Sequence, residues 1–503
     1  MKFSSVLLGT FLALASGHYV AEEPETLGRN DTPSKHHVRS HHKSDQPRVY
    51  GTHERTKHDN DNSNLRAAPV STNPAAGDGY AHERSAPTRS SHTHGNDVNE
   101  ARAGEGRSMT HDVLIIGAGV AGLSAAHELE KHGWTNYKIL EASDHIGGRI
   151  RQEWSFGEND EEYNIDLGAQ FIHTKQPGGG AGEYPHAYDL LQEMVSDPLE
   201  DNFKSTYTGA DAYTKQEPAR VYMSDGSWDT YHEPPEYRWA DDMGWHTFVT
   251  EYVAYDEVKA KVTNGCAVNQ ISTGGDGVSV TCADGSTHTA WWVIVTIPMK
   301  QLQKNAIAFS PDLPGNYRTA INSFIIGNAF KIWIEYQDQA EFKDLFTHKN
   351  DFAMFQTSWD VTTANAAQAG YRLFWNEQFP YGTGFDTKIV GGLIYGKGYD
   401  DYAGLTALQV KAKIEQYLNQ NGMVTNGVPT GKWTIMDWTK EQFIEGAYTI
   451  YGEEAHQRVL QEPTANGKLY FAGEALPVNS WGCVHGAART GRDQAKKIVD
   501  SCS

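Results

Sequence analysis

The feature that most constrains the fold is a glycine motif between an apolar strand and a helix. A continuous apolar run at 113–116 is followed by Gly117-x-Gly119-x-x-Gly122 and by a helix-forming segment at 123–129. Such an apolar run is typical of a strand buried on both faces. In a dinucleotide-binding turn, Gly117 permits the tight turn, Gly119 lets the backbone approach a pyrophosphate, and Gly122 lets helix and strand pack closely. The motif therefore predicts a Rossmann-type α/β unit.

The segments that follow supply further nucleotide-binding groups. A second predicted strand at 137–140 ends directly before Glu141, where an acid can accept a ribose hydroxyl. The helix N-terminus before it presents free N–H groups to phosphates. Gly147-Gly148-Arg149 come next, and a guanidinium there is suited to clamping the pyrophosphate, because arginine binds phosphate bidentately. At Gly168-Ala169-Gln170, small residues would let the backbone reach a flat ring.

The C-terminal region adds a third nucleotide-binding segment. An apolar strand is predicted at 469–472, followed by Gly473-Glu474 and by a glycine-opened helix from Gly482. The N-terminus of a helix carries partial positive charge, which would stabilise the electron-rich part of a reduced isoalloxazine. This arrangement favours FAD over NAD as the cofactor.

Composition excludes several classes of protein. The chain has 43 Lys and Arg against 64 Asp and Glu, a formal net charge of −21, which argues against a nucleic-acid binder. An acidic surface would attract cations. Beyond the N-terminus no run of 18 apolar residues occurs, so no membrane span is expected.

The N-terminal hundred residues differ from the rest. Lys2, an apolar run at 6–15 and small residues up to Gly17 predict a signal peptide at 1–17, and hence a protein secreted to the extracellular or cell-wall space. Residues 18–108 are rich in His, Ser and Thr and poor in large apolar residues, which predicts a disordered tail or pro-segment. Its histidines would allow loose metal binding, but we favour a soluble linker and predict no metal site.

Several of these motifs together resemble the flavin-containing amine oxidases, the monoamine and polyamine oxidases and their relatives. The resemblance rests on Glu141, Gly147-Gly148-Arg149, GAQFIH (168–173) and the terminal FAGE…GCVHGAARTG (471–491). It runs from about residue 111 to 500 and is strongest at both ends. In the middle, NGCAVNQIS (264–272) with the strand after it resembles the family hairpin whose valine, here Val268, touches the adenine.

The resemblance implies an α/β fold with a Rossmann-type FAD-binding domain built from discontinuous segments, and an α+β substrate-binding domain. The FAD-binding segments are expected at 109–175, 256–305 and 430–503, and the substrate segments at 176–255 and 306–429. The motifs and the resemblance together predict that FAD contacts Gly117, Ala118, Gly119, Val120, Ala121, Gly122, Glu141, Gly148, Arg149, Gly168, Ala169, Gln170, Phe171, Val268, Gly473, Glu474, Gly482, Cys483 and Val484.

The resemblance also implies an activity. Family members oxidise a C–N bond by passing a hydride equivalent to the flavin, and O₂ then reoxidises the flavin and gives H₂O₂. The cofactor supplies this chemistry, so no catalytic triad is expected. We therefore expect a secreted FAD-dependent oxidase of a small cationic amine, with a polyamine-like substrate favoured. The oligomeric state is not predicted.

Four residues match catalytic positions of the family. Lys331 in NAFKIWIEY matches the lysine that holds a water near the flavin. Two roles fit His173, which matches a histidine of polyamine-oxidising members: it orients the substrate amine, or it hydrogen-bonds in the core. Tyr448 matches one wall of the aromatic cage around the amine. Cys483 replaces the tyrosine of the other wall, so the cage is incomplete.

The cysteines leave alternatives open. Ala447 stands where animal monoamine oxidases carry the cysteine that binds flavin covalently, so FAD should be non-covalent. A thioether to Cys483 is the alternative. Cys266 and Cys282 lie on the two arms of the predicted hairpin and could form a disulfide, although sequence does not show whether the geometry permits it.

Two other functions fit the same fold. An L-amino-acid oxidase or a biosynthetic oxidase would need an arginine to bind a substrate carboxylate. Arg220, Arg238 and Arg372 lie in the expected substrate segments. A flavin-binding protein without turnover is the other alternative, because the cage is incomplete.

Overall fold

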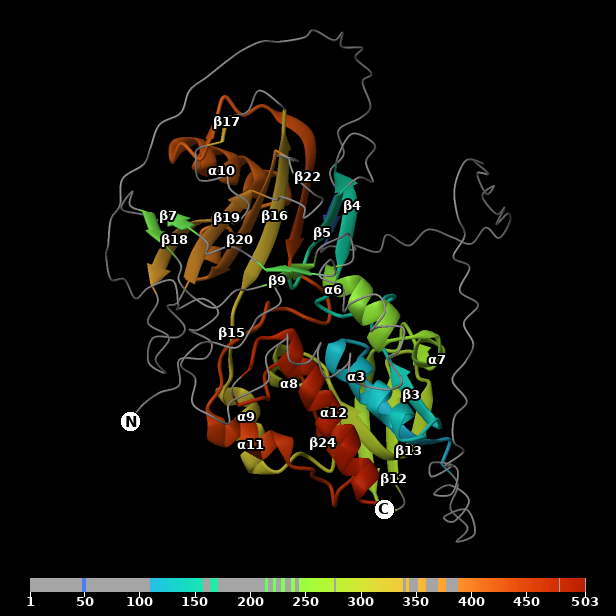
Figure 1. Ribbon diagram of the computed structural model, residues 1–503. Helices are drawn as coiled ribbons and strands as arrows, with labels where there is room; N and C mark the ends of the chain where they lie inside the picture. Colours follow the sequence, from blue (N-terminus) through green and yellow to red (C-terminus); the bar gives the residue numbers. More distant parts are fainter. Residues whose placement is uncertain are drawn as a thin grey trace, which may run out of the picture.

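The structure, a computed structural model, describes residues 109–156, 163–170, 244–275, 277–337, 388–478 and 480–502, with further short strands at 48–50, 213–215, 220–222, 228–230, 237–239, 341–342, 352–358 and 370–376. Figure 1 shows two lobes, the first below with α3 (Val120–Lys131) and α12 (Val484–Asp500), and the second above with β16 (Ala329–Tyr336) and β20 (Ile389–Gly396). Each lobe is built around one eight-stranded sheet.

The sheet of the first lobe is assembled from distant parts of the chain. Its order is β10-β3-β2-β13-β12-β11-β14, and β24 also pairs with β13. The three central strands β3, β2 and β13 are parallel, as is β24 with β13. The strands are β2 (His111–Ile116), β3 (Tyr137–Leu140), β10 (Val262–Thr263), β11 (Val268–Gly274), β12 (Gly277–Cys282), β13 (Thr287–Val295), β14 (Ala308–Ser310) and β24 (Leu469–Phe471). The predicted α/β fold with discontinuous segments is therefore confirmed.

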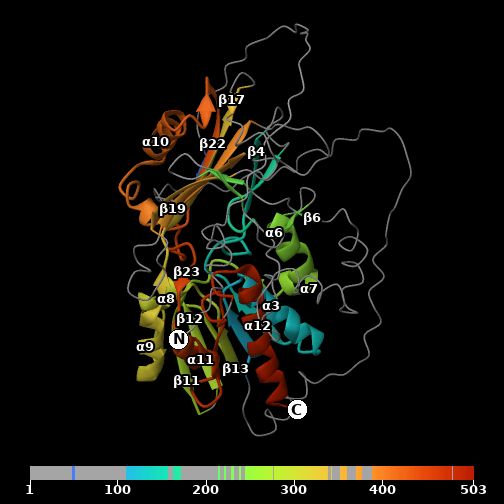
Figure 2. The same cartoon turned by 60° about the vertical axis from the view of Figure 1, so that its left-hand side comes forward.

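Helices cover both faces of this sheet. On one face α3 lies beside α12, and a Cβ at Gly491 would lie 2.0 Å from the carbonyl oxygen of Ala121, so the two helices pack in backbone contact (Figures 1 and 2). The same core includes residues of α6 (Gly244–Thr247), the π-helix η2 (Phe248–Val253) and α7 (Asp256–Lys259). On the other face lie α8 (Met299–Gln303), α9 (Gly315–Ser323) and α11 (Glu454–Gln461).

The second lobe contains a mainly antiparallel sheet in the order β1-β22-β16-β20-β19-β18-β7-β8. Its other strands are β1 (Arg48–Tyr50), β7 (Arg220–Tyr222), β8 (Trp228–Thr230), β18 (Phe352–Ser358), β19 (Gly370–Asn376) and β22 (Pro429–Asp437). One face packs on α10 (Ala407–Gln420), which begins with a capping box formed by Thr406 and Gln409. The other face packs on β4 (Gln152–Phe156) and β5 (Tyr163–Asp166).

Four short pieces complete the described elements. β15 (Ile325–Ile326) pairs with β23 (Thr449–Tyr451), and this pair connects the two lobes beside β16. The others are β6 (Tyr213–Lys215) with β9 (Tyr237–Trp239), β17 (Glu341–Phe342) with β21 (Val424–Thr425), and the 3₁₀ turn η5 (Lys397–Tyr399). Of the helices described, none is both long and apolar enough to cross a membrane.

The structure corrects four of the expected segment assignments. Residues 244–255 and 308–323 belong to the first lobe, because Trp245 and Ile321 are buried against its helices and sheet. Residues 430–437, expected in the FAD-binding domain, belong to the second lobe, because β22 pairs with β16. Residues 48–50, expected in a tail without structure, form β1 alongside β22.

Candidate active site

A cavity of about 550 Å³ lies at the carboxyl ends of β2, β3, β13 and β24. This edge is where open α/β sheets bind ligands. The first lobe provides most of its lining, and the second lobe contributes Lys331 from β16 and Leu393 from β20. The site therefore uses both lobes.

The glycine turn opens onto this cavity. Gly117 has φ of +104°, and a Cβ at Gly122 would lie 2.0 Å from the carbonyl oxygen of Gly117. A Cβ at Gly119 would meet no atom within 4 Å, so the backbone there is accessible from the cavity it lines. The N-terminus of α3 has no side-chain cap. Uncapped N–H groups at a helix N-terminus suit the phosphates of a dinucleotide.

Glu141 follows β3 and is held rigidly. Its Oε2 accepts the backbone N–H of Ala118 at 2.6 Å, and its Oε1 accepts the N–H and Oγ–H of Ser143 at 2.8 and 2.7 Å. The carboxylate lines the cavity. Carboxylate oxygens have further lone pairs, so Glu141 can still accept a ribose hydroxyl.

Arg149 and Glu474 join the two sequence motifs that flank the site. Arg149 Nη1 donates to Glu474 Oε1 at 3.1 Å and to the carbonyl oxygen of Ala447. Glu474 is 8% exposed, and its carboxylate also accepts the N–H and Oγ–H of Thr449 and the N–H of Gly482. The pair thus links three cavity segments that are far apart in the sequence.

Lys331 lies at the cavity, buried among main-chain oxygens. It is 6% exposed, and its Nζ donates to the carbonyl oxygens of Gly168 at 2.6 Å and Asp166 at 3.3 Å and to Gln170 Oε1 at 3.2 Å. The three N–H groups of its ammonium can thus each donate to one of these three oxygen atoms. The sequence analysis expected a glycine at 168 so that the backbone could approach a flat ring. The structure gives a different reason: a Cβ at Gly168 would lie 1.7 Å from the carbonyl oxygen of Arg149, so the neighbouring backbone excludes a side chain.

The aromatic wall consists of Tyr448, whose ring stacks on Tyr395 with centroids 4.4 Å apart and planes at 11°. Tyr448 lines the cavity together with Trp481 and Cys483. Cys483 is half-buried, is not part of a disulfide and is the N-cap residue of α12. Trp481 donates its Nε1–H to the carbonyl oxygen of Ile450 at 3.3 Å.

The predicted contact residues converge on the cavity with two exceptions within the described chain. Ala118 and Gly122 do not line it. Ala118 is buried and binds Glu141 through its N–H, and Gly122 packs against the turn. His173 and Phe171 lie outside the described residues.

Thr296 is a site residue that the sequence analysis missed. It lines the cavity, and its Oγ1–H lies within hydrogen-bonding distance of the carbonyl oxygens of Ile116 and Gly117. Its position directly after the apolar run at 291–295 is a signal that could have revealed it, because ligands bind at the carboxyl ends of buried parallel strands.

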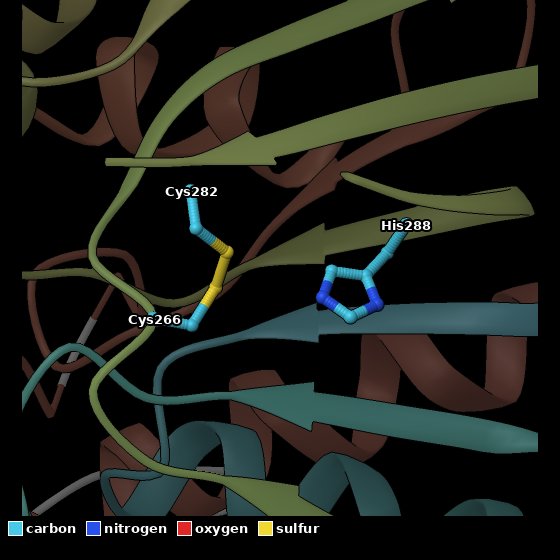
Figure 3. Close-up of side chains that lie close together, drawn as sticks. All are labelled: Cys266, Cys282 and His288. Atoms are coloured by element: carbon cyan, nitrogen blue, oxygen red, sulfur yellow. A yellow bond between two sulfur atoms is a disulfide. The ribbon is translucent and has the colours of Figure 1, made fainter. Parts of the chain in front are cut away.

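Cys266 and Cys282 form a disulfide with a Cα–Cα distance of 5.2 Å. Figure 3 shows the bond between the two strand arms, with the His288 ring beside it. Among the described residues these three are the group whose ligand atoms are close enough to hold a metal, within 4.8 Å. The two sulfurs are bonded to each other, so the group forms a cross-link, and Cys266 also lines the cavity.

These features together suit a site for a nucleotide cofactor at the junction of the two lobes. The family model of the flavin containing amine oxidoreductases matches residues 120–233 and 209–499. This is more than half of the chain, so the protein belongs to that family.

Individual relatives are distant. Lysine-specific histone demethylase 1B of Mus musculus is 24% identical over 462 residues, which cover 77% of this chain and 52% of the demethylase, so the chain spans about half the length of that relative. Polyamine oxidase 1 of Zea mays is 22% identical over 474 residues, covering 77% of this chain and 90% of the oxidase. A solved structure of redesigned putrescine oxidase has a TM-score of 0.53 at 15% identity, covering 78% of this chain and 99% of that one.

Proposed function

We propose that the protein is an amine oxidase that binds FAD non-covalently, oxidises a polyamine-like cation and passes the electrons to O₂ to give H₂O₂. The observation that carries this proposal is the placement of Lys331, which a strand of the second lobe brings to the cavity that the glycine turn opens. A bound flavin would supply the two-electron chemistry, and the protein would supply binding and orientation.

The proposal of FAD rests on the extent of the cavity. Its lining continues from Val268 and Glu141 past Gly119 to Lys331. A dinucleotide such as FAD needs a turn that binds its phosphates and an acid that binds its ribose. A flavin mononucleotide carries an open ribityl chain and has no ribose for Glu141. Non-covalent binding is supported by Ala447, whose methyl side chain cannot form a thioether.

Lys331 would act by holding the segment 166–170 at the cavity wall. Its Nζ donates hydrogen bonds to three oxygen atoms of this segment, at a position largely shielded from water. With three acceptors around Nζ, a water bound to this lysine would have to replace the longest contact, the one to Asp166. Tyr448 would receive the substrate amine from the cavity that it lines, with Tyr395 stacked on one face of its ring.

The arginines of the described site favour an amine over an amino acid. Arg149 and Arg151 line the cavity, and each is paired with a carboxylate, of Glu474 and Glu441 respectively. Arg372 pairs with Asp401 and lies over aromatic rings on the α10 side of the second sheet. The described lining therefore offers no guanidinium without a carboxylate partner for a substrate carboxylate. The side chains of Arg220 and Arg238 lie outside the described residues.

Secretion remains part of the proposal. It is supported by the signal-like sequence at 1–17 and by the disulfide of Cys266 and Cys282, because disulfides persist in oxidising compartments. Expression with and without residues 1–17 tests it. The full-length chain should appear in the medium with residues 1–17 removed, and the chain that lacks them should stay in the cell. Retention of the full-length chain in the cell would contradict secretion.

The test of the activity is an absorbance spectrum of the purified protein, followed anaerobically while spermidine, spermine, a monoamine and L-lysine are added in turn. Flavin bands that bleach with a polyamine and return with O₂ are the expected result. Bleaching by L-lysine alone would favour an amino-acid oxidase, and bands that no amine bleaches would favour a flavin protein without turnover. Flavin that stays with the acid-denatured chain would refute non-covalent binding and point to Cys483.

A further inference from the structure

Gln301 is a buried polar residue for which neither the fold nor the proposed chemistry gives a reason. It lies on α8, which begins directly after the segment 296–298 at the carboxyl end of β13. The residue lines the cavity although it is only 8% exposed. Within the described part of the chain, its Nε2 is buried and has no hydrogen-bond partner.

A buried amide donor without an acceptor costs free energy, so native proteins usually provide a partner. The same helix shows the usual outcome two residues later. Gln303 Nε2 donates to the carbonyl oxygens of Ile321 at 3.0 Å and Phe324 at 2.9 Å. Gln301 differs from Gln303 in that it lines the cavity, so a bound molecule can supply the partner of its amide.

Backbone contacts place Gln301 at the nucleotide end of the cavity. Its carbonyl oxygen accepts the N–H of Ala306 at 3.0 Å, and residues 306–307 line the cavity and lead into β14. β14 pairs with β11, in which Ala308 is opposite Gln270, and β11 begins at Val268, which also lines the cavity.

The same wall reaches the expected ribose site. The N–H of Cys266 donates to the carbonyl oxygen of Glu141 at 2.9 Å, and the cavity lining continues from there through residues 266–269. A dinucleotide whose ribose binds Glu141 would extend its base along this wall, because the base is attached to that ribose. The wall ends beside α8.

A carboxamide is chemically matched to one base in particular. Its oxygen accepts from the N6 amino group of adenine while its NH₂ donates to N7, as glutamine does in adenine recognition elsewhere. Hypoxanthine has acceptors at both of these positions, so the carboxamide cannot pair with both. We propose that the Gln301 carboxamide binds the adenine of the cofactor and selects it over other bases. This inference rests on the proposed binding of FAD.

The experiment compares two dinucleotides on flavin-free protein. One is FAD, and the other is flavin hypoxanthine dinucleotide, in which an oxygen replaces the N6 amino group. Wild-type protein is expected to bind FAD about tenfold more tightly than the analogue. Gln301→Met should bind both with similar affinity, because its side chain has a similar length but no amide. Gln303→Met is the matched control and should keep the full preference for FAD.

Thermal melts of the flavin-free proteins separate binding from folding. Gln301→Met should melt at or above the wild-type temperature, because it removes an unpaired amide, whereas Gln303→Met should melt lower. If Gln301→Met does not fold, Gln301→Leu also removes both amide groups and should likewise bind the two dinucleotides with similar affinity.

Two outcomes would overturn the inference while leaving FAD binding intact: a Gln301→Met protein that keeps the wild-type preference for adenine, or one that weakens both dinucleotides equally. Wild-type protein that binds neither dinucleotide would instead refute the proposed function.

Discussion

The substitution Glu474→Gln tests whether one buried carboxylate holds the site together. Its two oxygens accept from four donors: Arg149 Nη1, the N–H and Oγ–H of Thr449, and the N–H of Gly482. A glutamine side chain has nearly the same shape but only one oxygen. In either orientation its NH₂ group faces a donor, which is Arg149 in one case and the two backbone N–H groups in the other.

The magnitude follows from these contacts. A hydrogen bond to a charged group contributes about 1.5–3 kcal/mol, and at least one such bond is lost. The Arg149–Glu474 pair is also largely shielded from water, with side-chain exposures of 25% and 9%. We therefore expect the free energy of unfolding of the flavin-free protein to fall by about 3 kcal/mol.

Urea unfolding followed by tryptophan fluorescence measures this loss. Glu454→Gln is the matched control, because its pair with Arg458 is on the surface, with side-chain exposures of 60% and 66%. Such pairs contribute below about 1 kcal/mol. An equal effect of the two substitutions would refute the reasoning. Glu474→Gln should also release flavin more readily. It weakens the hydrogen bond that fixes Gly482, and Gly482 directly precedes the N-terminus of α12 at the cavity.

Three further substitutions test other parts of the site. Lys331→Met should slow anaerobic flavin reduction by the amine about 100-fold in stopped-flow measurements, because it removes three contacts that position the cavity wall; an unchanged rate would exclude this role. Replacing Cys266 and Cys282 by serine opens a cross-link between residues 16 apart and should lower the free energy of urea unfolding by about 3 kcal/mol, whereas an unchanged midpoint would show that the bond does not form. Burial, and next the charge of Lys138, lower the pKa of His288, so the unfolded chain binds more protons and stability falls as the pH drops below about 6.5. His288→Gln should lose less stability between about pH 7 and 5, and a loss as large as that of the wild type would count against this assignment.

The α/β architecture could be predicted because its signals are local. The apolar strand, the glycine turn and the helix are adjacent in sequence. Their glycines are required by groups close in sequence: a Cβ at Gly122, for example, would clash with the carbonyl oxygen of Gly117. Segment membership could not be predicted in the same way. The apolar pattern of 429–437 suits either sheet, and only its pairing with β16, about 100 residues earlier, decides the lobe.

The site could be predicted where residue type carries the chemistry. Lys331 and Tyr448 stand in patterns that resemble known ones, and both line the cavity. The partners of Lys331 could not be predicted, because two of them are main-chain oxygens, which every residue has. Gln301 was missed for a related reason. The five-residue helix α8 contains two glutamines and is too short for an interpretable spacing, and only burial without a partner for its Nε2 distinguishes Gln301 from Gln303.

Tyr448, the remaining wall of the incomplete aromatic cage, is fixed in position by the residues packed behind it. The ring of Tyr395 stacks behind Tyr448, and it fits because Gly327 has no side chain, since a Cβ there would lie 2.5 Å from the Tyr395 ring. The backbone of Gly327 also bonds to that of Ala447 and Tyr448. A single ring fixed from behind can offer only its cavity face to a cation. With a small thiol at Cys483 in place of a second ring, a substrate nitrogen would be oriented by one face of Tyr448 together with the lobe that carries Lys331.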